Sequence, residues 1–287
     1  MKIDLHTHST ASDGLYTPAE LIKLAREAGL SIIALTDHDT TNGLEPALAA
    51  GQARQLEVIP GIEINTDISG AEVHVLGYFL EYQQAAFQQT LQTLREMRVT
   101  RAQRMVAKLQ ALGLNITWER VRELAAGTVG RPHVAAALVE GGYAASVADA
   151  FNRYLGRNGP GYVPRYKLAP LDAIKLINSV HGLPVMAHPA GISGLEHLLP
   201  SLCEAGLVGI EVYYGEYDAQ TVEYLKSLAD YYHLIPTGGS DYHGPGIHPT
   251  QLGARAVPEE SVARLRTSAL ERRRTPAPAF ELPPYRM

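Results

Sequence analysis

Histidines and carboxylates stand at the ends of strand-like runs in this chain of 287 residues, which contains 11 histidines. The first run ends in His6-Thr7-His8, and because strand side chains alternate with a period of two, both imidazoles point to the same side. A solvent-exposed pair is the alternative for this motif alone. Later runs add residues of the same kind, which gives six histidines and three carboxylates in all: His6, His8, His38, His74, His188, His243, Asp13, Glu63 and Asp241.

Nine candidate ligands are more than one ion needs, so the set predicts two or three divalent metal ions with at least one bridging carboxylate. Nitrogen and oxygen ligands without a thiolate favour Mn, Fe or Zn over Ca or Mg, and Mn is our first choice. Such a cluster suits the hydrolysis of phosphate esters, because one ion generates hydroxide near neutral pH while the ions together neutralise phosphoryl charge. Asp37 and Asp39 flank a ligand and are predicted to orient it, with surface exposure as the alternative.

Short apolar runs alternate with helix-like segments, the pattern of parallel strands joined by crossover helices. Thr17 and Glu20 form a predicted capping box that starts the first helix. Seven runs predict an α/β fold, a distorted TIM-like (β/α)7 barrel, with the candidate ligands at the C-terminal ends of strands, where such barrels build active sites. The expected strands are residues 2–6, 31–36, 57–62, 72–79, 184–187, 209–213 and 234–238.

One interval breaks this alternation, because more than a hundred residues separate the fourth and fifth strands. We therefore expect an inserted helical cap domain at residues 98–168, and a barrel formed by residues 1–97 and 169–287. Helices are expected at residues 85–112, 118–125, 132–140 and 146–155, from their apolar periodicity.

The end of this insert is basic, although the net charge of the chain is −5. Residues 151–168 contain Arg153, Arg157, Arg165 and Lys167 and no acidic residue, with three tyrosines between them. A guanidinium matches phosphate oxygens and tyrosine stacks on bases, so Arg131 and Arg157 are predicted to clamp a phosphorylated nucleotide. The alternative is a solvated loop whose arginines only keep the domain soluble.

Composition excludes several classes of protein. A hydrophobic content of 46% with 19% charged residues is that of an ordinary globular chain. No apolar run approaches the roughly 20 residues of a membrane helix, and no signal peptide follows Met1, so we expect a cytoplasmic protein. The single cysteine, Cys203, cannot form an internal disulfide, and redox chemistry is not expected. No obligate protein partner is indicated.

The candidate ligands fall into four motif blocks along the chain: His6-x-His8 with Asp13, Thr36-Asp37-His38, Gly61-Ile62-Glu63 with His74, and Ala187-His188-Pro189 with Ser240-Asp241-x-His243. This series resembles the polymerase and histidinol phosphatase (PHP) family over residues 1–253. The resemblance implies a distorted seven-stranded barrel, a trinuclear metal centre in which the nine residues are both ligands and catalytic groups, and phosphoesterase activity.

The insert is similar to one branch of that family. Gly130-Arg131-Pro132-His133 and Arg157-Asn158-Gly159-Pro160 resemble the branch of nucleoside 3′,5′-bisphosphate phosphatases and 5′-to-3′ exoribonucleases. The resemblance implies that Arg131, His133, Arg157 and Asn158 bind substrate, and that the reaction removes the 3′-phosphate from a nucleotide such as adenosine 3′,5′-bisphosphate to give AMP. Capping of a helix is the alternative role for His133.

Four other functions stay open at this point: 5′-3′ exoribonuclease on short RNA, histidinol-phosphate phosphatase, amidohydrolase, and a non-enzymatic PHP metal-binding module. An amidohydrolase usually has a bridging lysine, whereas Glu63 occupies the bridging type of position here. Histidinol phosphate calls for an acidic contact to its amine, which the basic loop does not offer. A non-enzymatic module tolerates loss of ligands, whereas this chain has all nine.

Overall fold

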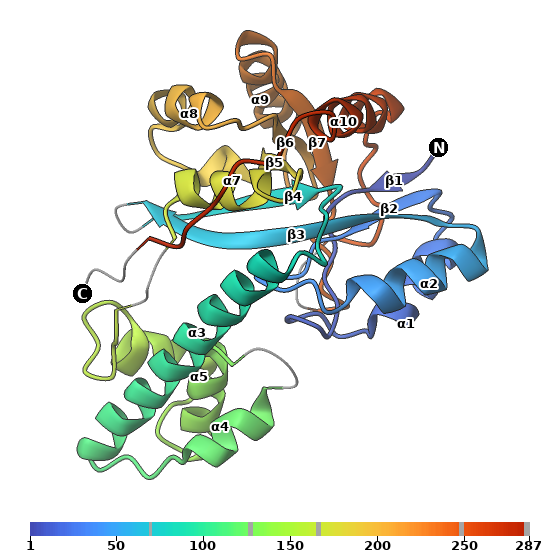
Figure 1. Cartoon of the computed structure of the whole chain (residues 1–287). Helices are drawn as coiled ribbons and strands as arrows, with labels where there is room; N and C mark the ends of the chain where they lie inside the picture. The colour runs from blue at the N-terminus through green and yellow to red at the C-terminus, as the bar shows by residue number, and fades with distance from the viewer. Residues whose placement is uncertain (69–70, 126–128, 165–167, 247–249, 284–287) are drawn as a thin grey trace. The chain divides into compact units, whose positions relative to one another are not determined.

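The computed structural model describes the whole chain except residues 69–70, 126–128, 165–167, 247–249 and 284–287 (Figure 1). The chain divides into two compact units. The first consists of Met1–Gln89 and Lys167–Pro284, and the second of Thr90–Tyr166 and Tyr285–Met287. Each unit is described by itself below.

The first unit is built on a single sheet whose seven described strands follow one another in chain order. The sheet closes on itself, because the Leu5 N–H donates to the Gly238 carbonyl at 3.2 Å and Thr7 forms a parallel bridge with Tyr242. This confirms the distorted seven-stranded barrel. The strands are β1 (Ile3–Asp4), β2 (Ile32–Leu35), β3 (Glu57–Ile68), β4 (Ala71–Tyr78), β5 (Leu183–Met186), β6 (Gly209–Tyr214) and β7 (Ile235–Gly239).

The prediction of an all-parallel sheet is wrong at β4, which runs antiparallel to both β3 and β5. β3 continues six residues beyond its predicted end at Ile62, so only residues 69–70 separate it from β4. A parallel pair needs a crossover of about a dozen residues or more, and so short a connection permits only a hairpin. His74 consequently lies in the middle of this hairpin, paired with Asn65, and not at the end of a parallel strand.

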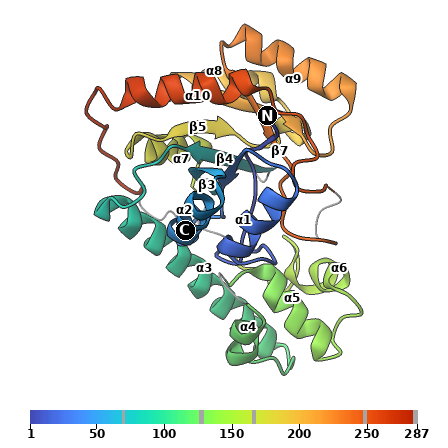
Figure 2. The same ribbon diagram turned by 90° about the vertical axis from the view of Figure 1, so that its right-hand side faces the viewer.

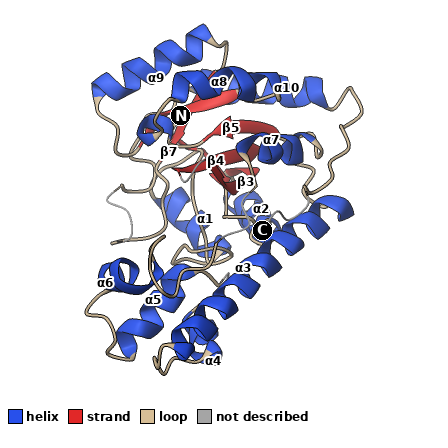
Figure 3. Ribbon diagram, turned by 90° about the vertical axis from the view of Figure 1, so that its left-hand side faces the viewer, coloured by secondary structure: helices blue, strands red, loops and turns tan. Residues whose placement is uncertain are grey.

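Helices cover the barrel strands on both sides, with α8, α9 and α10 on one side and α1 and α2 on the other (Figures 2 and 3). The predicted capping box is present at the start of α1, where the Glu20 N–H donates to Thr17 Oγ1 and the Thr17 N–H donates to Glu20 Oε2. The helices of this unit are α1 (Pro18–Glu27), α2 (Leu44–Arg54), α7 (Pro170–Asn178), η2 (Pro189–Gly191), α8 (Leu195–Glu204), α9 (Ala219–Tyr231) and α10 (Glu259–Arg272).

The second unit is helical in the residues that are described. Its long helix α3 (Ala85–Ala111) begins in the first unit and is followed by α4 (Trp118–Leu124), α5 (Arg131–Glu140), α6 (Val147–Ala150) and η1 (Phe151–Leu155). Met105, Leu109, Val134, Leu138 and Leu155 are fully buried in a core of its own. Among the helices whose residues are described, none has both the length and the apolar character required to cross a membrane.

Candidate metal centre

The barrel brings the nine candidate ligands into one cluster. Three overlapping groups have their ligand atoms within 4.8 Å of one another, and together they include eight of the nine residues. The ninth, His188, joins through its Nε2, which lies 3.1 Å from Glu63 Oε1. The groups are His8 with Asp13, His38 and His243; His6 with His8, Glu63 and Asp241; and His38 with Glu63 and His74.

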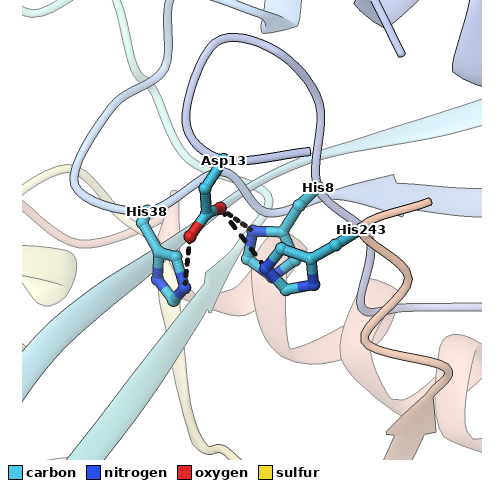
Figure 4. Close-up of side chains that lie close together, drawn as sticks. All are labelled: His8, Asp13, His38 and His243. Atoms are coloured by element: carbon cyan, nitrogen blue, oxygen red, sulfur yellow. Dashed lines mark ion pairs between the residues drawn. The ribbon is translucent and has the colours of Figure 1, made fainter. Parts of the chain in front are cut away.

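The first group converges on Asp13, in the loop that follows His8 (Figure 4). Asp13 Oδ1 lies 3.3 Å from His243 Nε2 and 3.8 Å from His8 Nδ1, and Asp13 Oδ2 lies 3.8 Å from His38 Nε2. The Asp13 side chain is 50% exposed, whereas that of His8 is inaccessible. Asp13 therefore marks the side of the cluster that solvent can reach.

The two other groups share Glu63, whose side chain is buried in β3. Its Oε2 lies 3.2 Å from Nε2 of both His6 and His8 and 3.0 Å from His38 Nδ1, and its Oε1 lies 2.8 Å from His74 Nδ1. With His188, one carboxylate thus faces five imidazoles through two oxygens. Each oxygen of Glu63 thus faces its own set of imidazoles, His6, His8 and His38 on Oε2 and His74 and His188 on Oε1.

Several buried polar atoms of the cluster make no hydrogen bond of acceptable geometry within the protein: both ring nitrogens of His8, His74 Nε2 and Asp241 Oδ1. Such an atom costs about 1–3 kcal/mol when it is left unsatisfied, so proteins rarely bury one without reason. A cation would satisfy Asp241 Oδ1 and one nitrogen of each imidazole, whose other nitrogen carries the ring N–H. Imidazole nitrogens and carboxylate oxygens without thiolates are also the donor set that Mn, Fe and Zn accept. The residues present therefore fit a cluster of divalent ions.

Electrostatics within the cluster favour ionised carboxylates. Although burial raises it, the neighbouring His38 and His6 hold the pKa of Glu63 well below its usual range. Burial lowers the pKa of His38 to about 3. Burial also opposes protonation of His8, but the carboxylates of Asp241 and Glu63 outweigh it and raise the pKa of His8 to about 10. A cation that replaces the His8 proton would meet the same negative charge.

A family model described as PHP domain matches residues 4–156, which is more than half of the chain. The chain belongs to the PHP domain family. Its similarity to whole proteins extends further: a 3′,5′-nucleoside bisphosphate phosphatase from Chromobacterium violaceum is 34% identical over 88% of this chain and 90% of its own length. The 5′-3′ exoribonuclease Rnm from Salmonella typhimurium is 35% identical over 84% of this chain and 85% of its own length.

A third relative is named for a different activity. The phosphoribosyl 1,2-cyclic phosphate 1,2-diphosphodiesterase from Eggerthella lenta is 34% identical over 88% of this chain and 98% of its own length. Among solved structures, one of an amidohydrolase from Chromobacterium violaceum with bound sulfate has a TM-score of 0.80 and 31% identity, and covers 93% of this chain and 97% of that chain. Family and fold together identify the protein as a PHP metal-dependent phosphoesterase.

Asp37 and Asp39 of this PHP protein hold main chain near the ligands. Asp37 accepts hydrogen bonds from the Ser9 N–H, Ser9 Oγ and Ser12 Oγ, each at 2.7 Å, and so fixes the loop that leads to Asp13. Asp39 accepts from the Asn65 N–H at 3.0 Å and from Asn65 Nδ2 at 3.1 Å. Both aspartates are buried, so the alternative of surface exposure is wrong.

Two further buried carboxylates, Asp4 and Glu211, were missed by sequence reasoning. Asp4 accepts from the Ser240 N–H at 2.9 Å and the Gly253 N–H at 2.7 Å, which fixes the chain beside Asp241. Glu211 contacts His6 and His188. In both cases the sequence shows a single acidic residue inside an apolar strand. Because a buried charge requires a partner, such a residue indicates a buried contact.

The four predicted substrate-binding residues lie in the second unit. Arg131 is the first residue of α5, with its guanidinium 5.5 Å from the ring centre of Phe151. His133 Nδ1 accepts a hydrogen bond from the Gly130 N–H at 3.0 Å. His133 therefore caps the start of this helix, which is the alternative role predicted for it. Arg157 and Asn158 are exposed in a turn after η1.

One arginine of the basic loop, residues 151–168, makes contacts within the protein. Arg153 donates to the Tyr143 carbonyl at 2.8 Å and pairs with Asp149 at 3.2 Å. Arg165 and Lys167, the other two basic residues of this loop besides Arg157, lie outside the described residues. Arg157, the other arginine in the described part of this loop, is exposed.

Proposed function

We propose that this protein removes the 3′-phosphate from nucleoside 3′,5′-bisphosphates, giving the nucleoside 5′-monophosphate and phosphate. The observation that best supports a phosphatase reaction is that three groups of candidate metal ligands overlap at His8, His38 and Glu63. The choice of substrate is supported by the relative from Chromobacterium violaceum, similar over 90% of its length, whose name is that activity.

In this proposal His6, His8, Asp13, His38, Glu63, His74, His188, Asp241 and His243 hold two to three divalent ions, Mn being the first choice and Fe or Zn the alternatives. When bound, the ions supply an activated water near neutral pH and positive charge for the phosphoryl oxygens. Glu63, the most buried carboxylate of the cluster, fixes the spacing between ligand groups. Asp13 and His188, with side chains 50% and 27% exposed, line the side from which a phosphate ester enters.

A second candidate, 5′-3′ exoribonuclease activity on short RNA, is favoured by the Salmonella relative at 35% identity. The two reactions differ in the bond that is broken, a terminal phosphomonoester or an internal diester. Both reactions use a substrate with a 5′-phosphate, so a basic residue that contacts this phosphate does not distinguish the two activities. Rates measured on both kinds of substrate do distinguish them.

We expect the Mn-loaded protein to release phosphate from adenosine 3′,5′-bisphosphate at least tenfold faster, in kcat/KM, than from AMP or histidinol phosphate. A 5′-phosphorylated RNA oligomer, analysed for released mononucleotides, is assayed in parallel. Preferred degradation of the oligomer assigns the exoribonuclease activity instead. Preferred hydrolysis of histidinol phosphate contradicts both candidates.

The second phosphate of a bisphosphate needs a cationic site of its own, and Arg157 is the proposed contact, with Arg131, His133 and Asn158 as further candidates. A charge-assisted bidentate contact is worth roughly 1.5–3 kcal/mol, so Arg157→Ala should lower kcat/KM for the bisphosphate about 10- to 100-fold. A nucleoside 3′-monophosphate lacks the 5′-phosphate and should be hydrolysed by the variant almost as fast as by the wild type.

Arg153→Ala is the matched control, since Arg153 belongs to the same loop but is engaged with Tyr143 and Asp149. Its substitution should affect the two substrates equally. If Arg157→Ala also slows both substrates to the same extent, Arg157 does not recognise the 5′-phosphate, even where the phosphatase activity itself is confirmed.

A further inference from the structure

Strand β6 contributes none of the nine candidate ligands, yet it places a fully buried carboxylate, Glu211, against two of them. Glu211 Oε1 lies 3.1 Å from His6 Nδ1, and Glu211 Oε2 accepts a hydrogen bond from the His188 N–H at 2.8 Å. His6 follows β1 and His188 follows β5. One side chain therefore connects two ligands that come from strands far apart in the sequence.

We infer that Glu211 is a positioning residue of the metal centre, which sets the ring orientation of His6 and the main-chain conformation of His188 without binding an ion itself. The inference rests on the proposed function, because it assigns Glu211 a role toward the same ions. It goes beyond the nine ligands, since neither the motif blocks nor the strand-end pattern includes Glu211.

The contact with His6 defines which ring nitrogen faces the cluster. Both ring nitrogens of His6 face carboxylates, which can only accept, so a cation held at Nε2 would leave the single N–H of a neutral His6 on Nδ1, donating to Glu211. The lone pair is then on Nε2, which lies 3.2 Å from both Glu63 Oε2 and Asp241 Oδ1. A carboxylate behind a ligand histidine fixes its tautomer and increases its basicity. Glu211 thus prepares His6 to bind through Nε2.

The contact with His188 acts on the main chain. His188 has φ 28° and ψ 58°, a left-handed conformation that is uncommon for a residue with a side chain. The hydrogen bond from its N–H to Glu211 holds this conformation, and His188 Nε2 consequently lies 3.1 Å from Glu63 Oε1. Without that acceptor, the chain after β5 has no such restraint at this N–H, and His188 can turn away from Glu63.

Glu211→Gln tests the inference with almost no change in shape. An amide offers one acceptor oxygen, so either His6 Nδ1 or the His188 N–H must face an NH2 group. We expect the affinity of the full-length protein for Mn and for Zn, measured by competition with a chromogenic chelator, to fall at least tenfold. An affinity equal to that of the wild type overturns the inference.

Tyr78→Phe is the matched control for damage to the barrel interior. The Tyr78 hydroxyl is buried and donates to the Leu5 carbonyl at 2.9 Å, but Tyr78 is not one of the candidate ligands. Its loss should lower the melting temperature and leave metal affinity within about twofold of the wild type. If Tyr78→Phe weakens metal binding as much as Glu211→Gln, the effect belongs to the fold, and the positioning role is wrong.

A spectroscopic measurement on the wild type keeps the test independent of whether Glu211→Gln folds. In the Zn-loaded protein, long-range 1H–15N correlation of labelled histidines should show His6 protonated at Nδ1, with His6→Asn used to assign the signals. Protonation of His6 at Nε2 overturns the inference. A wild type that binds no metal under these conditions contradicts the proposed function instead, so the two failures are distinguishable.

Discussion

Glu63→Gln is expected to lower the phosphatase turnover of this protein about 1000-fold, a change of about 4 kcal/mol in activation free energy. The reason is the position of Glu63, whose two oxygens face His6, His8, His38, His74 and His188. An amide removes the negative charge shared by two of the three ligand groups, and its NH2 group faces imidazoles that need an acceptor or an ion. Steady-state kinetics with saturating Mn, together with metal analysis of the purified variant, measure the effect.

Glu57→Gln is the matched control for this substitution. Glu57 lies on the same strand, but its side chain is 41% exposed and pairs with Arg266 on the surface. Exposed ion pairs contribute little, so turnover and metal content should stay within about twofold of the wild type. If Glu63→Gln keeps normal turnover, Glu63 is not a ligand that the reaction requires, and the proposed role of its carboxylate is wrong.

The convergence of the nine residues could be predicted from sequence because a simple rule relates strand ends in a barrel. Side chains at the C-terminal ends of successive strands face one rim, so His8, His38 and Asp241 meet although they are far apart in the chain. The rule needs only the positions of the strands, which apolar runs reveal well. The role of these residues as ligands remains a prediction that metal binding must test.

The antiparallel hairpin of β3 and β4 could not be predicted from sequence in the same way. A run of apolar residues does not state the direction of a strand, and the pattern after Ile62 does not show that β3 continues to Ile68. The direction follows only from the length of the connection, once both strand ends are known. His74 still reaches Glu63, because it lies on the strand that pairs with β3.

Buried carboxylates that contact the candidate ligands or the chain beside them are harder to predict from sequence than the ligands themselves. Glu211 and Asp4 stand alone within apolar strands and belong to no motif, so their partners are visible only in three dimensions. The sequence predicts the boundaries of the inserted domain at residues 97/98 and 168/169, and the two compact units divide after Gln89 and Tyr166. The first boundary falls inside the continuous helix α3, where no capping residue or loop marks it.

Removal of metal is expected to abolish turnover, with a loss of at least 1000-fold after exhaustive chelation, and to lower the melting temperature by about 10 °C. Ions that bind only the folded protein contribute about 4 kcal/mol at a concentration of 1,000 Kd, and 1 kcal/mol corresponds to about 2–4 °C in a protein of this size. In their absence the protein still buries both unsatisfied nitrogens of His8 together with Asp241 Oδ1. Differential scanning fluorimetry and phosphate release on the same samples provide the two readouts.

Refilling the chelated protein with Mn tests whether the ligand groups act together. The three groups overlap at His8, His38 and Glu63, and because a neutral imidazole has one lone pair, only the two oxygens of Glu63 could serve two ions. One ion therefore cannot use both oxygens of Glu63 and the ligands of all three groups, and activity should lag until more than one equivalent per chain is bound. Full turnover with a single equivalent would reduce the centre to one working site. It would leave the remaining carboxylates and histidines as a structural network, without the paired charge that a phosphate ester requires.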